Sequence, residues 1–203
     1  MEQAKDHNFA TVSGSLVQEL VYSHSIYGES FYDGFLSVPR LSGTEDILPF
    51  TVSDRLLKNI EICPGHFYSI SGQMRSYNKH DSASNRLVLT VFARSFAELD
   101  AEDCQNEIAL TGYLCKPPVY RKTPFSREIA DILLAVNRSY SKSDYLPCIA
   151  WGRNARFVSE LPVGQHLRVE GRVQSRTYQK QLPDGTLQPR TAYEVSINTL
   201  ECL

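Results

Sequence analysis

The sequence lacks long apolar runs, paired cysteines and recognisable catalytic motifs. No stretch of 18 apolar residues occurs among its 203 residues, which argues against a transmembrane helix. The segment MEQAKDHNFATVSG at the N-terminus carries a single lysine and no apolar core, so we expect no secretory signal peptide. We therefore expect a cytoplasmic protein without a membrane partner.

The five cysteines form no CxxC or CxxxC pair, so a zinc knuckle or zinc ribbon is not expected. Their odd number fits reduced, mostly buried thiols in a reducing compartment. None of the five histidines has metal-ligand spacing, and no GxSxG, HExxH or P-loop motif is present. We expect no enzyme, no catalytic residue, no metal site and no cofactor.

The chain contains an internal repeat at an offset of 98 to 99 residues. SGSL at residues 13–16 matches TGYL at 111–114, and further pairs fall in the same register: Val21 with Val119, Leu48 with Leu146, Arg55 with Arg153 and Gly72 with Gly171. We predict two copies of one domain, residues 1–100 and 105–203. The segment 97–106 carries four acidic residues and no basic one, which is typical of a solvated linker.

Both copies have the patterns of short strands. In the second copy, apolar or alternating segments at 107–116, 129–137, 145–151, 165–178 and 191–203 predict five strands, with a short helix at 152–161. The first copy gives the same order, with its helix at 53–60 beginning at Ser53 or Asp54. We predict an all-β fold of two tandem OB-fold five-stranded barrels, each with one short helix between strands 3 and 4.

Four stretches of the second copy carry a family likeness: LTGYLCKPPVYRKTP, DILLAVNRSY, IAWGRNARFVSELPVGQHLRVEGRVQSRTY and YEVSI. In their order and spacing, over about 95 residues, they resemble the bacterial single-stranded DNA-binding (SSB) proteins. The first copy resembles this family only weakly. The resemblance implies an OB fold that wraps single-stranded DNA without strong sequence preference, in replication, recombination or repair. It also implies a unit of four OB domains, which this chain would reach as a homodimer.

The resemblance assigns DNA contacts to residues of the second copy. Base stacking is assigned to four aromatic residues: Tyr140, Tyr145, Trp151 and Tyr178. Phosphate contact at family positions is assigned to Arg121, Arg153 and Arg176, and proximity to the aromatics adds Arg138, Lys142, Arg172 and Lys180. The alternatives are that the aromatics belong to the barrel core and that each basic residue is simply a solvated surface charge.

The two copies differ in charge and in aromatic content. Residues 1–104 hold eight Lys and Arg against 14 Asp and Glu, whereas residues 105–203 hold 13 against nine. In the register of Tyr140, Tyr145 and Trp151, the first copy has Ser42, Ile47 and Ser53. A polyanion should prefer the second copy. We expect the first copy to bind DNA poorly and to serve as a dimer or partner interface.

Other functions remain open. An OB fold hosts many functions, so the chain could be a protein-interaction module, such as a primosome or mobile-element accessory factor, with weak or no DNA binding. Nothing in the sequence reads a 2′-hydroxyl, so RNA is a third ligand class. Replication and primosome proteins are candidate partners.

Overall fold

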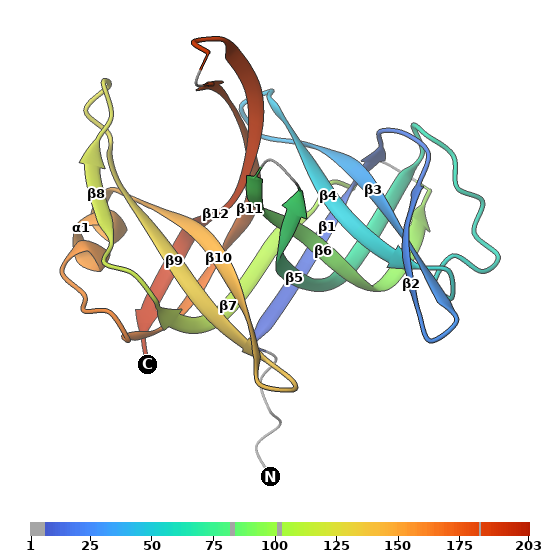
Figure 1. Cartoon of the computed structure of the whole chain (residues 1–203), viewed down its shortest axis with the longest axis horizontal. Coiled ribbons are helices and arrows are strands. Elements are labelled where there is room, and N and C mark those ends of the chain that lie inside the picture. The colour runs from blue at the N-terminus through green and yellow to red at the C-terminus, as the bar shows by residue number, and fades with distance from the viewer. Residues whose placement is uncertain (1–6, 82–83, 101–102, 183) are drawn as a thin grey trace.

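The computed structural model describes residues 7–81, 84–100, 103–182 and 184–203. Within these residues the chain forms 12 strands and one helix, in two sets that lie side by side (Figure 1). The first set is β1 (Asn8–Leu16), β2 (Val21–Ile26), β3 (Glu29–Pro39), β4 (Glu45–Ser53), β5 (Phe67–Asp81) and β6 (Ser84–Leu99). The second set is β7 (Asn106–Leu114), β8 (Val119–Lys122), β9 (Glu128–Arg138), β10 (Lys142–Trp151), α1 (Gly152–Ser159), β11 (His166–Gln181) and β12 (Leu187–Cys202).

The two sets share one pattern of strand pairing. In the first, β1 pairs with β5, β5 with β6, β6 in parallel with β4, and β4 with β3, which also bonds to β1. The second set repeats this series: β7 pairs with β11, β11 with β12, β12 in parallel with β10, and β10 with β9, which also bonds to β7. The all-β prediction and the two-part arrangement are confirmed. The short strands β2 and β8, which the sequence analysis missed, lie at the two ends of the sheet order.

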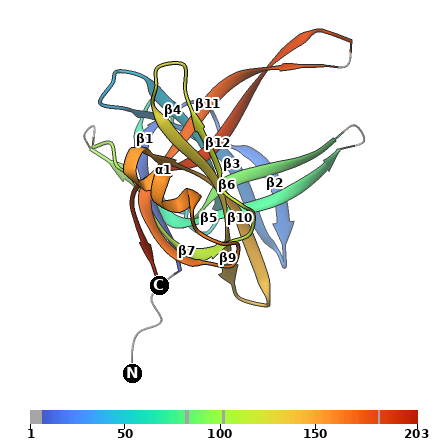
Figure 2. The same ribbon diagram turned by 90° about the vertical axis from the view of Figure 1, so that its left-hand side faces the viewer.

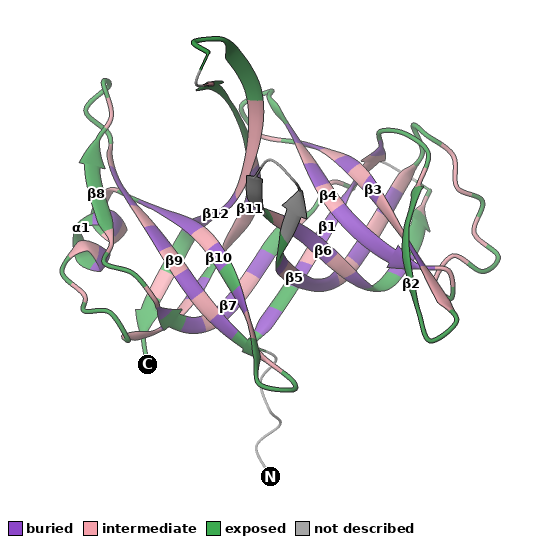
Figure 3. Ribbon diagram, viewed as in Figure 1, coloured by how far each residue is buried: buried purple, intermediate pink, exposed green. Residues whose placement is uncertain are grey.

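Burial follows the alternation of apolar residues along each strand (Figure 3). On β9, Ile132, Leu134 and Val136 are buried, and the residues between them are partly exposed. Side chains of successive strand residues point to opposite faces, so one face of each strand packs into the core. The alternation read from the sequence therefore reflects strands with one buried face and one more exposed face in each set.

The glycines that recur at an offset of 99 mark equivalent bulges. The strand register shifts between Ser71 and Gly72 on β5, and between Glu170 and Gly171 on β11. A Cβ atom at Gly72 would lie 2.0 Å from the carbonyl oxygen of Phe92, and one at Gly171 would lie 2.0 Å from that of Ser196. Only glycine lets the two backbones approach so closely, which explains its presence in both copies.

We expect Gly171→Ala to lower the free energy of unfolding by about 1–3 kcal/mol, because the added methyl group meets a backbone oxygen that cannot move without its strand. Urea unfolding followed by circular dichroism measures the loss. Glu170→Ala, one position earlier on the exposed face, is the matched control and should stay within about 0.5 kcal/mol of the parent. Equal stabilities of the two variants would contradict the expectation.

The helix predicted at residues 53–60 is wrong. This segment forms successive turns, closed by hydrogen bonds of 3.0–3.3 Å between residues three apart, and Asn59 has a φ of +65°, which a right-handed helix does not contain. The Tyr68 hydroxyl donates to the Glu61 carbonyl and accepts from the Cys63 amide, both at 2.9 Å. Tertiary contact with β5 thus holds the following segment in a non-helical course. The helix predicted in the second copy is present as α1.

The acidic segment 97–106 is only partly the solvated linker that its composition predicts. Its first residues belong to β6, which ends at Leu99, and Cys104 packs against the core. The Gln105 amide donates to the Ser13 hydroxyl at 2.6 Å, so the end of the linker is fixed to β1. Only a few residues separate β6 from β7, and the last of them is hydrogen-bonded to β1.

The cysteines are less buried than the sequence analysis predicts. Cys148 is buried, Cys63, Cys104 and Cys115 are partly buried, and Cys202 is exposed. Burial raises the pKa of the Cys148 thiol, which keeps it neutral. In the described residues, no helix is long and apolar enough to cross a membrane, and no cluster of three His, Cys, Asp or Glu residues could hold a metal ion.

The two sets are joined by an antiparallel ladder between β1 and β7. Ala10 faces Ile108 in this ladder, and the two are equivalent positions of the repeat, so an approximate twofold axis passes between them. The amide side chain of Asn8 bonds to both backbone groups of Met74, at 2.6 and 2.8 Å. Asn106 does the same to Val173, at 2.8 Å for each bond. The interface therefore has the self-complementary character of a twofold dimer contact.

Two fully buried carboxylates reinforce this interface at equivalent places. Asp144 of β10 accepts the amide of Ser76 at 2.8 Å, and Asp46 of β4 accepts the amide of Ser175 at 2.6 Å. Each also contacts an arginine of the other set: Arg75 lies 3.2 Å from Asp144, and Arg172 lies 3.1 Å from Asp46. The negative charge of each carboxylate is thus balanced by an arginine from the other side of the interface.

Candidate nucleic-acid interface

The four predicted stacking aromatics lie outside the core. Tyr140, in the turn between β9 and β10, is 94% exposed; Tyr145 on β10 is 48% exposed; Tyr178 on β11 is 40% exposed; and Trp151 is 37% exposed at the end of β10. The alternative that they form the barrel core is therefore wrong. Tyr145 and Trp151 share the outer face of β10, whereas Leu146 and its alternate neighbours point inward.

Trp151 is held in a fixed orientation although its ring is accessible. Its indole Nε1 donates to the Ser196 hydroxyl on β12 at 3.0 Å. Trp151 and Arg121 both pair with Ile129 of β9, one from each side, so the three residues form a row across three strands. Arg153 follows at the start of α1 and is exposed. Trp151 therefore has one arginine in the same cross-strand row and another two residues further along the chain, an arrangement suited to contact a base and its phosphates.

A second group lies on the long hairpin of β11 and β12, which projects from the second set (Figure 2). Arg176, Tyr178 and Lys180 occupy alternate positions of β11 and so point to one side of it. The guanidinium carbon of Arg176 lies 5.5 Å from the Tyr178 ring centroid. Arg176 also lies 3.9 Å from Glu194, a separation that leaves its charge only loosely paired.

The remaining cations have structural neighbours. Arg121 is paired with Asp131 at 2.9 Å on the surface, where such pairs exchange readily with solvent. Arg172 is directed to Asp46 in the interface between the two sets, so the structure does not bring it together with the hairpin group. Arg138, Tyr140 and Lys142 line one pocket at the end of the β9–β10 hairpin. The predicted residues thus form three groups on the second set, with Tyr145 between them and Arg172 apart.

Comparison with known proteins identifies the family of the domain that carries these groups. Residues 105–203 match the family described as the single-strand binding protein family. The chain carries a domain of this family. Single-stranded DNA-binding protein 1 of Staphylococcus aureus is 37% identical over an alignment of 83 positions, which covers 37% of this chain and 50% of that protein. Single-stranded DNA-binding protein A of Bacillus subtilis is 36% identical over an alignment of 83 positions, which covers 37% of this chain and 48% of that protein. The match spans about half the length of these relatives.

A solved structure extends the likeness to the whole fold. The wild-type single-stranded DNA binding protein from Thermus aquaticus superposes with a TM-score of 0.75 and 21% identity, over 97% of this chain and 92% of that one. A deletion variant of the same protein gives a TM-score of 0.74. The likeness shows that the chain consists of tandem OB domains, of which the second is the single-strand binding family domain.

The first OB domain has no aromatic residue at the positions equivalent to Tyr145 and Trp151. The strand register confirms the equivalences: Ile47 pairs with Ser37 as Tyr145 pairs with Ala135, and Ser53 occupies the place of Trp151. Ser53 is buried, and its hydroxyl bonds to Glu29. A small polar residue at that position cannot stack on a base.

The sequence analysis missed a contribution of the first domain to the pocket beside Tyr140. Five residues of the first domain line it: His7, Asn8, Gln73, Arg75 and Arg94. No sequence pattern could have indicated them, because Arg75 and Arg94 lie on β5 and β6, more than 40 residues before the β9–β10 turn. Their proximity to Tyr140 follows only from the way the two domains are joined.

Proposed function

We propose that the protein binds single-stranded DNA without strong sequence preference, through its second OB domain. The observation that supports this most directly is the exposure of four aromatic rings among basic residues on a domain of the single-strand binding family. Bases of any identity stack on such rings, each contributing about 1–3 kcal/mol, while Arg and Lys follow the phosphates. Tyr140, Tyr145, Trp151 and Tyr178 would take the bases.

The basic residues of the second domain would take the phosphates in this proposal. Arg121 shares a cross-strand row with Trp151 and Arg153 follows it by two residues. Arg176 and Lys180 lie two positions to either side of Tyr178 on β11, and Arg138 and Lys142 line the same pocket as Tyr140. Arg172 would act indirectly, by fixing the domain interface through Asp46. The surplus of four positive charges on residues 105–203 supports the same assignment.

We also propose the finer organisation of the chain. The domains would extend over residues 1–100 and 105–203, each a five-stranded barrel. The pairings of β3 with β1 and of β9 with β7, which return each series of strands to its first member, support this view. A homodimer would supply four OB domains, and roles in replication, recombination or repair, with replication or primosome proteins as partners, would follow from single-strand binding.

A titration with oligo(dT) tests the function. We expect quenching of Trp151, the only tryptophan, as a base stacks against its exposed indole face, and weaker binding as salt rises because bound phosphates release counterions. The intrinsic fluorescence is followed at several salt concentrations, with anisotropy of a labelled oligonucleotide as a second signal. Oligo(rU) of equal length measures any preference for RNA. No quenching and no anisotropy change would refute the proposal in favour of a protein-interaction module.

A further inference from the structure

The pocket between the two domains is rich in positive charge. It has a volume of about 650 Å³, and four of its ten lining residues carry a permanent positive charge: Arg75 and Arg94 from the first domain, and Arg138 and Lys142 from the second. Asp and Glu are absent from the lining among the residues that the structure describes. Such a concentration of one sign of charge in a concave site attracts anions.

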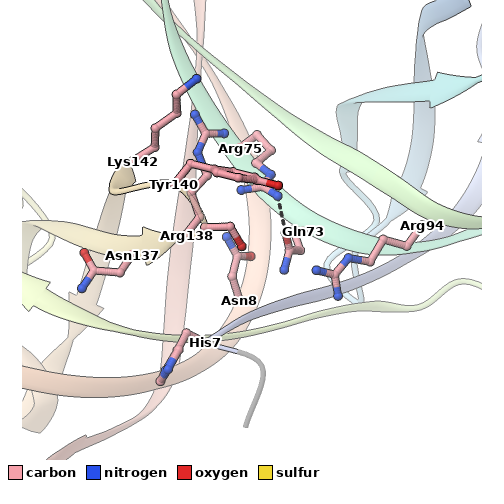
Figure 4. A pocket seen from close by; sticks show the side chains of 10 residues that line it. His7, Asn8, Gln73, Arg75, Arg94, Asn137, Arg138, Tyr140 and Lys142 are labelled. Carbon is pink, nitrogen blue, oxygen red and sulfur yellow. Dashed lines mark hydrogen bonds between the residues drawn. The ribbon is translucent and has the colours of Figure 1, made fainter. Parts of the chain in front are cut away.

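Two of the four cations are oriented in advance by a carboxylate behind the pocket. Asp144, which is fully buried, lies 3.2 Å from Nη1 of Arg75 and 3.6 Å from Nη1 of Arg138. Arg75 also donates to the Gln73 side chain (Figure 4). One negative charge therefore orders two guanidinium groups from different domains. Because the two guanidinium groups are already ordered in the free protein, a ligand loses less binding free energy to side-chain entropy.

The pocket also has an aromatic surface. The Tyr140 ring is exposed and lies beside Arg75 and Arg138, with Lys142 on one side of it and Arg94 further away on the other (Figure 4). A stacking ring among cations is the combination that binds a single strand, with a base on the ring and phosphates on the cations. A small inorganic anion would use the charges and leave the ring unused.

We propose that this pocket binds the phosphodiester backbone of a single strand where it passes from the second domain to the first, with Arg75 and Arg94 as phosphate contacts. The inference rests on the proposed function and extends it to the first domain. That domain lacks stacking aromatics at the equivalent positions but supplies half of the positive charges of this shared site. The path of the strand is thereby continuous with Tyr140 and Lys142 of the second domain.

The test measures the dependence of oligo(dT) affinity on salt in the full chain. Arg94→Ala removes an exposed first-domain cation, so the plot of log affinity against log salt should become shallower by about 0.7, the value for one phosphate on a single strand. Arg94→Lys keeps the charge and should restore the parental slope. Arg168→Ala is the control, because Arg168 lies among Glu170 and Glu201 away from the pocket, and should leave the slope unchanged.

The outcomes separate this inference from the function on which it rests. Binding of the parent protein with an unchanged slope in Arg94→Ala would overturn the inference and leave the function standing. Failure of the parent to bind any oligonucleotide would overturn both. If Arg94→Ala lowers the urea midpoint, Arg94→Gln replaces it, since the amide keeps hydrogen-bonding capacity while removing the charge.

Discussion

A chain carrying Tyr140→Ala and Tyr178→Ala together should bind oligo(dT) at least about thirtyfold more weakly than the parent protein. Each ring is expected to contribute about 1–3 kcal/mol of stacking, so the pair contributes about 2–6 kcal/mol. Both rings are exposed, and Tyr140 lies in a turn, so their removal should leave the fold intact. Anisotropy of a labelled oligonucleotide at fixed salt gives the two dissociation constants.

The matched control keeps the rings and removes the hydroxyl groups. Tyr140→Phe with Tyr178→Phe should bind nearly as tightly as the parent, because stacking depends on the aromatic face. The salt slope should be the same in all three proteins, since no charge is changed. A double alanine variant with parental affinity would show that these two aromatics are not part of the binding surface.

Replacement of Asp144 by alanine should lower the free energy of unfolding by about 3–5 kcal/mol, the usual cost of removing one partner of a buried ion pair. The variant leaves the buried amide of Ser76 without its acceptor and removes the charge that faces Arg75 and Arg138. Asp144→Asn keeps an acceptor oxygen but not the charge, so its free energy of unfolding should lie between those of the parent and Asp144→Ala. Urea unfolding, followed by circular dichroism, measures the differences.

The control for this prediction is an exposed carboxylate on the neighbouring strand. Asp131 pairs with Arg121 at 2.9 Å but is 40% exposed in its side chain, so Asp131→Ala should cost at most about 1 kcal/mol. A loss for Asp144→Ala no larger than that for Asp131→Ala would show that the buried carboxylates contribute little to the domain interface. Asp144→Ala should also bind oligo(dT) more weakly than the parent if Asp144 orients Arg75 and Arg138 in the shared pocket.

The outer face of β10 shows why sequence alone left the aromatics undecided. Alternation separates Leu146 and Cys148 on one side from Tyr145 and Trp151 on the other, and by size alone the aromatic side looks like core. In the structure the smaller side chains face the core together with Asp144, which is fully buried because the other domain supplies its partners. A buried charge of this kind cannot be inferred from one strand.

The segment at 53–60 shows the same limit for local structure. Its composition is compatible with a helix, and the equivalent segment of the second domain forms α1. Within the segment itself, the Asp54 amide donates to the Ser30 carbonyl of β3 at 2.9 Å, and Asn59 has a φ of +65°, so the chain follows turns instead of a helix. Helix propensity is a weak preference that tertiary context overrides, so the composition of this segment does not determine its structure.

The duplication, the strand-rich character of both copies and the difference in charge and aromatic content between them follow from the amino-acid sequence alone. These are properties of residue order and type, read from a fixed offset and a period of two. Tertiary structure alone decided which aromatics are exposed, that Asp46 and Asp144 are buried across the domain interface, and that Arg75 and Arg94 lie beside Tyr140. These depend on the β1–β7 ladder, which brings together residues far apart in the chain whose contact leaves no local signal.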